Sequence, residues 1–333
     1  MGRSAASVID LCPDWDLIVR WLVTGAEGQL GRCLVSQLQA GSEDVLAGAF
    51  SRGSLDVSDK GQVQHLRETV LGEVDIVVNA AAVTAVDRCE TESAQAFAVN
   101  AEGPAFLGEA CRDTGTRMIH VSTDYVFDGN ASRPYSEEHP RSPRSVYGRS
   151  KAEGEVRLLE LMPEALVVRT SWLFGPGRNF VVSIREQAEK RQRGEVSGTL
   201  RVVDDQHGTP TYAGDLADGL RQLGRQLGGG EKLKGDRVVS ENRPPAGLMH
   251  LCNSGQASWF SFAREILDQS GFSQVGIEPS ETADLNLPAP RPSYSVLDCA
   301  RAESLGIRLR SWQAALAAYL GTEWGEAPLG GRS

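Results

Sequence analysis

Residues 17–31 read LIVRWLVTGAEGQLG, and this stretch decides the fold. Its first eight residues, Leu17–Thr24, are mostly apolar, which is typical of a parallel strand that is buried on both faces. A glycine-rich turn follows directly, and from Gln29 to Leu38 the apolar residues recur at helical spacing. A strand, a glycine turn and a helix in this order favour a dinucleotide site, because the turn lets a pyrophosphate approach the backbone and the helix N-terminus faces its charge.

The same alternation of strand and helix continues along the chain. Further apolar runs predict buried strands, and helical spacing predicts helices between them. The strands are Val45–Phe50, Val74–Ala80, Arg117–Ser122 and Ala165–Thr170, and the helices are Val63–Val70, Ala94–Val99, Pro104–Thr114 and Ser150–Leu161. Such alternation is the signature of a parallel sheet with helices on both faces. The sequence therefore predicts an α/β fold with a doubly wound parallel sheet, a Rossmann fold.

The pattern changes after Trp172, where segments rich in Gly and Pro interrupt it. We expect residues 17–172 to form an NAD(P)-binding Rossmann domain. Residues 173–324 are predicted to form mainly a smaller C-terminal substrate-binding lobe, with some segments returning to the first domain. We interpret residues 1–16 as a flexible extension, 228–245 as a long loop and 325–333 as a loose tail.

Composition excludes several classes of protein. The 333 residues carry 44 acidic and 34 basic side chains, a formal net charge of −10, so a nucleic-acid partner is not expected. No run approaches the roughly 20 apolar residues that span a bilayer, and no signal peptide is evident, so we expect a cytoplasmic protein without a membrane partner. The six cysteines are scattered without a C-x-x-C pair, which predicts neither a zinc site nor a disulfide framework.

The turn after the first strand has the spacing G-x-x-G-x-x-G. The predicted cofactor contacts there are Gly25, Glu27, Gly28, Gln29, Leu30 and Gly31. After the second strand, the stretch 49–52 (AFSR) lacks the acidic residue that usually binds the ribose of NAD, and Arg52 could accept a 2′-phosphate instead. NADPH is therefore the expected cofactor, with NADH still open and a solvated loop arginine as the alternative interpretation of Arg52. Asp56 and Val57 lie where they could contact the adenine.

Two further strand ends carry small or polar residues. Ala80, Ala81 and Ala82 follow Asn79 and leave room for a flat nucleotide, although a plain strand end would have the same pattern. Ser122-Thr123-Asp124 ends the next strand, and Tyr147 and Lys151 follow at a spacing that places both on one helix face. A phenol with a pKa near 10 is a poor acid at neutral pH, but a nearby ammonium lowers that pKa. A threonine hydroxyl beside them can bind a substrate carbonyl.

These motifs, in this order, resemble an extended short-chain dehydrogenase/reductase. More closely, the chain resembles the dTDP-4-dehydrorhamnose reductase family. The resemblance rests on NAAAVTAVDRCE (79–90), HVSTDYVFDG (120–129), VYGRSK (146–151), RTSWLFG (169–175), VVDDQHGTPTY (202–212) and RPSYSVLD (291–298). It implies hydride transfer from NADPH or NADH to C4 of dTDP-4-dehydro-L-rhamnose, with Thr123, Tyr147 and Lys151 as the catalytic residues.

The resemblance also implies a role for each residue. Tyr147 would protonate the C4 oxygen, Lys151 would bind the nicotinamide ribose and lower the Tyr147 pKa, and Thr123 would hydrogen-bond the C4 oxygen. Thr123, Asp124 and Trp172 would contact the dTDP-ketosugar. Arg291 is a candidate contact for its diphosphate, with a surface salt bridge as the alternative.

Other functions stay open at this stage. The main alternative is a sister 4-ketoreductase that acts on another dTDP-4-ketohexose, as in antibiotic deoxysugar biosynthesis; a 4-epimerase and a non-catalytic NADP-binding regulatory subunit are further ones. A dehydratase is disfavoured because Tyr125 stands where dehydratases carry a glutamate. No metal site is predicted: Asp87 and Glu90 are expected to be structural, and a magnesium requirement stays undecided. The protein is expected to be a monomer or a homodimer.

Overall fold

The computed structural model of the protein describes residues 18–41, 44–228 and 245–326. The predicted extension (1–16), nearly all of the predicted loop (228–245) and most of the predicted tail (325–333) lie outside these ranges. Within the described ranges, no helix is both long and apolar enough to cross a membrane.

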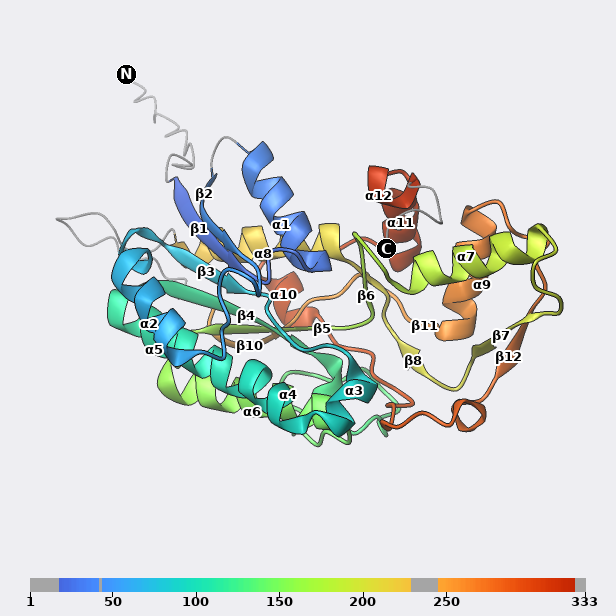
Figure 1. The fold of residues 1–333 in the computed structure, drawn as a ribbon, viewed down its shortest axis with the longest axis horizontal. Coiled ribbons are helices and arrows are strands. Elements are labelled where there is room, and N and C mark those ends of the chain that lie inside the picture. Colours follow the sequence, from blue (N-terminus) through green and yellow to red (C-terminus); the bar gives the residue numbers. More distant parts are fainter. Residues whose placement is uncertain (1–17, 42–43, 229–244, 327–333) are drawn as a thin grey trace, which may run out of the picture.

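A six-stranded parallel sheet organises the larger part of the molecule (Figure 1). Its strands, in spatial order, are β10 (Gly247–His250), β5 (Leu166–Thr170), β4 (Arg117–Thr123), β3 (Ile76–Asn79), β1 (Val19–Thr24) and β2 (Asp44–Phe50). All five neighbouring pairs are parallel. The strands β3 and β5 lie inside the sheet and are buried along their whole length, which is why each begins with a run of apolar residues. The predicted doubly wound parallel sheet is confirmed.

Helices cover both faces of this sheet. The helices α1 (Gln29–Ala40) and α8 (Ala213–Gly228) pack on one face, where their leucines meet Trp21 and Ile76 of the sheet. On the other face lie α2 (Lys60–Thr69), the 3-10 turn η1 (Leu71–Glu73), α5 (Gly103–Thr114) and α6 (Val146–Leu161). The carboxyl ends of the parallel strands therefore meet at one edge between two helical layers, where open α/β sheets bind ligands.

Several helices differ from their predicted limits. The predicted helices 94–99 and 104–114 belong to one helical stretch, made of α4 (Ser93–Phe97), a π-helical turn η2 (Ala98–Glu102) and α5; the short α3 (Val86–Thr91) precedes it. Pro104 lies in the first turn of α5, directly after the π-helical turn, and the stretch continues through it. The helix α6 begins at Val146 rather than Ser150, since the Ser145 hydroxyl caps it by accepting a hydrogen bond from the Gly148 amide at 3.1 Å.

A smaller lobe follows β5 and has its own apolar core. It contains α7 (Phe180–Gln192), α9 (Trp259–Gln269), α11 (Trp312–Leu320), α12 (Glu323–Glu326) and the 3-10 turn η4 (Thr282–Leu285). Three two-stranded pairs lie between them: β6 (Leu173–Phe174) with β9 (Thr211–Tyr212), β7 (Leu200–Val203) with β12 (Ile277–Ser280), and β8 (His207–Gly208) with β11 (Ala257–Ser258). In Figure 1 this lobe lies on the right, beyond the carboxyl edge of the large sheet.

Segments from the second half of the chain also belong to the larger lobe. The helix α8 packs against α1, the strand β10 pairs with β5, and α10 (Ala300–Ser304) contacts β10. The chain thus crosses between the lobes several times, and these crossings tie the larger sheet to the smaller lobe.

Candidate active site

The glycine turn after β1 lies directly against the end of β3. Gly25 has φ +69, and a Cβ atom there would lie 2.6 Å from the amide nitrogen of Ala81. Gly31 leaves no room for a side chain against the carbonyl oxygen of Gly25. These two glycines bring the turn, Ala80–Ala82 and the start of α1 together, as the predicted dinucleotide site requires.

Polar groups at the turn fit a nucleotide cofactor. Gly28 is the N-cap of α1 and has no side chain to cap it, so the first amides of a 12-residue helix face outward. The buried Oε1 atom of Gln29 has no hydrogen-bond partner among the described residues. Glu27 is exposed, whereas the side chain of Leu30 is buried in the core, so only its backbone is left to face a ligand.

The residues after β2 lie farther along the same edge. Arg52 is exposed, and its Nη2 atom can donate to the side-chain oxygen of Gln95 at 2.7 Å. The Oδ1 atom of Asp56 accepts hydrogen bonds from the Ser58 amide at 3.0 Å and the Ser58 hydroxyl at 2.6 Å. Val57 is buried against Gly103. Of the three predicted contacts Arg52, Asp56 and Val57, Arg52 is therefore the one whose side chain can most readily reach an anionic ligand.

The structure brings Thr123, Tyr147 and Lys151 together between β4 and α6. Thr123 is the last residue of β4, and Tyr147 and Lys151 lie on the first two turns of α6. All three are buried, with 6%, 8% and 2% of their surface exposed. Close packing of α6 against the loop after β4 depends on Gly148, where a Cβ atom would clash with the Tyr125 carbonyl oxygen.

The ionisation of this group is set mainly by burial. Burial raises the pKa of Tyr147, and its hydrogen bond with Thr123 opposes that shift. Burial also lowers the pKa of Lys151 to about 8, while the charge of Glu155 acts in the opposite direction. The Nζ atom of Lys151 donates to the Val121 carbonyl oxygen at 2.6 Å. The predicted lowering of the Tyr147 pKa by Lys151 stays a prediction.

Asp124 extends the site toward the smaller lobe. It is 2% exposed, and its Oδ1 atom accepts a hydrogen bond from the Thr123 hydroxyl at 3.0 Å. Its Oδ2 atom has no well-formed hydrogen bond in the described chain. Burial raises the pKa of Asp124 to about 6, and interactions with Ser295 and Thr123 limit the rise. A buried carboxylate oxygen without a well-formed hydrogen bond is able to accept one from a ligand hydroxyl.

Trp172 lies in a cluster that its own sequence context did not reveal. Its ring stacks on Trp259 with centroids 3.6 Å apart and planes 5° apart. Trp172 has φ +46, an uncommon backbone conformation for a large residue, and Gly208 gives its ring the space it needs. The indole nitrogen of Trp259 donates to Gln206 at 3.1 Å. Sequence reasoning missed Trp259 because 86 residues lie between the two tryptophans, a separation that no local spacing rule covers.

Arg291 does not lie free in the smaller lobe. Its Nη2 atom pairs with the Asp87 carboxylate at 2.8 Å, and its side chain is 13% exposed. Asp87 therefore has a structural partner, and Glu90 accepts a hydrogen bond from the Val146 amide at the start of α6. No group of three His, Cys, Asp or Glu side chains in the described ranges is arranged to hold a metal ion. Arg291 would have to share its guanidinium between Asp87 and a diphosphate.

A buried ion-pair network supports the site from behind. Glu155, one turn after Lys151 on α6, is fully buried and accepts hydrogen bonds from the Ser122 hydroxyl at 2.6 Å and from Arg169 at 2.8 and 2.6 Å. Arg141 reaches the same carboxylate at 3.2 Å. The spacing of Lys151 and Glu155 on one helix face was the available sequence signal for this network.

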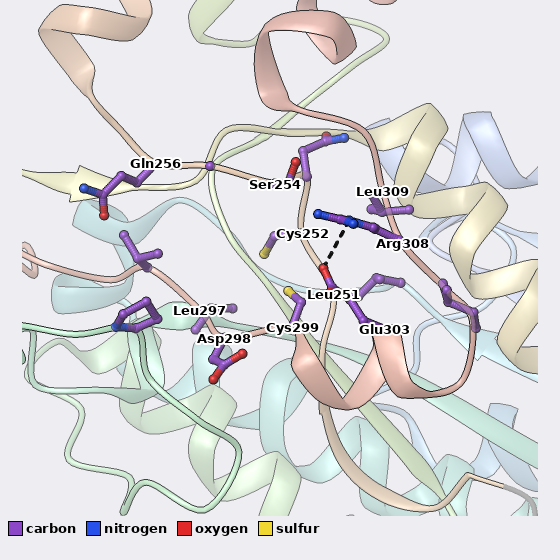
Figure 2. A pocket seen from close by; sticks show the side chains of 15 residues that line it. Leu251, Cys252, Ser254, Gln256, Leu297, Asp298, Cys299, Glu303, Arg308 and Leu309 are labelled. Carbon is purple, nitrogen blue, oxygen red and sulfur yellow. Dashed lines mark ion pairs between the residues drawn. The ribbon is translucent and has the colours of Figure 1, made fainter.

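A cavity of about 400 Å³ lies between the segment that follows β10 and the stretch around α10 (Figure 2). It is lined by residues 251–256, 296–299, 303 and 307–309 together with Pro134. The side chains of Cys252 and Cys299 point toward one another there, and the Cys252 sulfur lies 3.4 Å from the Ser171 hydroxyl. The cavity lining includes none of the predicted site residues, so the cavity is separate from the catalytic group.

Comparison with known proteins places the chain in a family. The family model described as RmlD substrate binding domain matches residues 19–323. The chain is 43% identical over 301 residues to dTDP-4-dehydrorhamnose reductase of Streptomyces griseus, which covers 89% of this chain and 91% of the relative. It is 42% identical over 304 residues to a probable dTDP-4,6-dihydroxy-2-methyloxan-3-one 4-ketoreductase of Streptomyces antibioticus, with 90% and 93% covered. The crystal structure of dTDP-4-dehydrorhamnose reductase from Bacillus anthracis in complex with NADP is similar at a TM-score of 0.80 and 30% identity, covering 91% of this chain and 99% of that one.

The parallel sheet, the glycine turn and the Thr–Tyr–Lys group together define an NAD(P)H-dependent oxidoreductase with a Rossmann fold. Within that class, the chain belongs to the dTDP-4-dehydrorhamnose reductase family. The family predicted from the sequence motifs, the fold and the enzyme class are thereby confirmed.

Proposed function

We propose that this protein reduces the C4 keto group of dTDP-4-dehydro-L-rhamnose with NAD(P)H and forms dTDP-L-rhamnose. The observation that carries the proposal is the meeting of Thr123, Tyr147 and Lys151 at the end of β4, beside a glycine turn that fits a nucleotide. The similarity to dTDP-4-dehydrorhamnose reductases over about nine-tenths of the chain supports the substrate class. We place the reaction in the cytoplasm.

The dihydronicotinamide, when bound, supplies the hydride, and the chain's own residues position the carbonyl and provide the proton. Tyr147 donates its phenolic proton to the C4 oxygen as negative charge develops there. Thr123 lies beside the phenol and offers its hydroxyl to the same oxygen; its hydrogen bond to Asp124 must rearrange for it to donate. Lys151 binds the ribose and stabilises the phenolate that Tyr147 becomes.

The substrate would extend from this edge toward the smaller lobe. Trp172 and Trp259 offer an aromatic surface there, and the unpaired oxygen of Asp124 can accept from a sugar hydroxyl. Arg291 is the candidate for the diphosphate, with Asp87 holding its guanidinium in place. These assignments rest on the positions of the side chains along one edge of the molecule.

Identifying the reaction product would test which ketosugar the protein reduces. We expect the purified protein, incubated with NADPH and with dTDP-4-dehydro-L-rhamnose made in situ, to give a product with the mass and the NMR spectrum of dTDP-L-rhamnose. The opposite configuration at C4, or turnover only with another ketosugar, would favour the second candidate, a 4-ketoreductase for a different dTDP-4-ketohexose. That candidate is kept because the Streptomyces antibioticus relative, a probable 4-ketoreductase, is 42% identical to this chain. One hydroxyl or methyl group in a pocket is enough to separate such substrates.

We further propose that NADPH is preferred over NADH, because Arg52 follows β2 where NAD-selective enzymes carry an acid. Replacing Arg52 with Asp is expected to invert the preference, and Arg52→Ala should abolish it without improving NADH use. A charge-assisted hydrogen bond of this kind corresponds to roughly tenfold to hundredfold in kcat/KM. The measurement is kcat/KM for both cofactors with one ketosugar. Equal use of the two cofactors by the unmodified protein would show that Arg52 does not contact the 2′-phosphate.

A further inference from the structure

A row of buried polar side chains runs across three strands to Lys151. Thr24, Asn79 and His120 are register partners on β1, β3 and β4, and His120 faces Lys151 on α6. All four residues are at most 2% exposed. The contacts run from Thr24 Oγ1 to Asn79 Oδ1 at 2.7 Å, from Asn79 Nδ2 to His120 Nδ1 at 3.0 Å, and from His120 Nε2 to Lys151 Nζ at 3.3 Å.

The direction of each hydrogen bond follows from groups that can only donate. The backbone amide of Ala81 lies 3.2 Å from Asn79 Oδ1, and an amide N–H has no acceptor role. This contact fixes which end of the Asn79 side chain is the oxygen. The other end is therefore the NH2 group, which must donate to His120 Nδ1. A nitrogen that accepts carries no proton, so neutral His120 holds its proton on Nε2.

The proton on Nε2 creates a conflict with Lys151. A lysine ammonium has three N–H donors and no acceptor, so it cannot take a hydrogen bond from an imidazole N–H. One of its N–H groups donates to the Val121 carbonyl oxygen at 2.6 Å. The imidazole N–H and any ammonium N–H directed at it repel each other. The ammonium must therefore direct its remaining protons away from His120.

We propose that His120 is a positioning residue for the reaction: held as the Nε2–H tautomer by Asn79, it directs the free N–H groups of Lys151 away from the sheet, while the Val121 carbonyl holds the Lys151 Nζ atom in place. The side left to those N–H groups is the side of the ligand edge, where Tyr147 lies one turn earlier on α6. His120 touches neither substrate nor cofactor in this role. It acts only through Lys151.

The charges around Lys151 agree with this arrangement. Burial lowers the pKa of His120 well below its usual value, and the charge of Lys151 adds to that, so the imidazole stays neutral. Burial lowers the pKa of Lys151 to about 8, against the opposing charge of Glu155 on the same helix. Arg169 of β5 and Arg141 both pair with Glu155, and they partly compensate that charge. Asp124 lies beyond Thr123, and Tyr147 lies one turn before Lys151 on α6.

The first test reads the tautomer directly. In the unmodified protein, nitrogen NMR of the imidazole rings should show one histidine that is in the Nε2–H form and does not titrate between pH 6 and pH 9. Its signal should disappear in His120→Gln. The proposal would be overturned if His120 were found as the Nδ1–H tautomer, or with both ring nitrogens protonated in that pH range.

The second test follows NADPH binding against pH. If the ammonium holds the ribose, affinity should fall above the Lys151 midpoint near pH 8, by up to about tenfold for each pH unit. In His120→Gln, the new side-chain amide is free to turn its oxygen toward Nζ and accept, which favours the ammonium. The substitution should therefore raise this midpoint by about half a pH unit or more. An unchanged midpoint would contradict the role assigned to His120.

His250 provides a matched control. It is also a fully buried histidine on a strand of the same sheet, but its Nε2 atom faces Arg169 at 3.4 Å. His250→Gln should leave the NADPH midpoint unchanged, whatever it does to thermal stability. An equal shift in both variants would mean that any buried histidine has this effect, and the proposal would be wrong. Both tests are independent of the ketosugar, and the tautomer test is also independent of cofactor binding, so they can fail or succeed apart from the proposed function.

Discussion

Replacing Tyr147 with Phe is expected to reduce turnover by roughly 10²- to 10⁴-fold, the range that general acid catalysis contributes. The phenol is the proposed proton donor beside Thr123, and the substitution removes only its oxygen. The ring keeps its edge contact with Tyr125, whose centroid lies 5.5 Å away at an interplanar angle of 72°. Packing of α6 against the sheet should therefore survive, and the Kd for NADPH should change by no more than about twofold.

The measurement is kcat from the loss of NADPH absorbance with dTDP-4-dehydro-L-rhamnose, together with the NADPH Kd from a fluorescence titration. Tyr125→Phe is the matched control, because Tyr125 is the neighbouring tyrosine on η3 (Asp124–Val126) and has no part in the proposed proton transfer. It should retain nearly normal turnover. Turnover of Tyr147→Phe close to that of the control would remove Tyr147 from the role of acid.

Lys151→Met is expected to weaken NADPH binding by about tenfold or more and to lower kcat by about 10²-fold or more, because the ammonium both binds the ribose and stabilises the phenolate. Methionine has a similar length and no charge. The folded-state pKa of Lys151 is lowered to about 8, mainly by burial, which means that the ammonium is less stable in the folded protein than in water. Removing it should leave the thermal unfolding temperature unchanged or higher.

Weaker binding and slower turnover together with an undiminished unfolding temperature would distinguish a lost function from a damaged fold. Lys60 lies on the surface near Glu109, so Lys60→Met removes the same charge without touching the site and should leave kcat, Kd and the unfolding temperature nearly unchanged. If Lys151→Met lowers kcat while the NADPH Kd stays that of the unmodified protein, the contact with the ribose is not made.

The parts of the fold and site that could be predicted are those with a local signal. The glycine turn, Asn79-Ala80-Ala81 and the Thr123, Tyr147 and Lys151 group each follow a buried strand or share one helix face. Parallel strands then bring these separate motifs to one edge because all their carboxyl ends point the same way. The same logic explains why the doubly wound sheet could be predicted from the amino-acid sequence.

The features of the fold and the site that could not be predicted depend on contacts between residues far apart in the sequence. Arg291 pairs with Asp87, 204 positions earlier, so a residue predicted to face the diphosphate is already engaged. Trp259 stacks on Trp172 from another element, and the π-helical turn at Ala98–Glu102 joins two helices that are separate in the sequence pattern. The tautomer of His120 depends on the orientation of Asn79, which in turn depends on one backbone amide. No spacing rule contains such information.

The strand β10 and the helix α8 have a consequence for protein engineering. Both come from the second half of the chain, yet β10 is the edge strand beside β5 and α8 covers α1. A fragment that ended after Trp172 would leave β5 as an unpaired edge and expose the leucines of α1, which is a route to aggregation. The two lobes are consequently not interchangeable modules. A chimera with the sugar-recognition half of a relative would have to exchange the loops between β6 and β9 and around α9 individually, while this chain's own α8 and β10 stay in place.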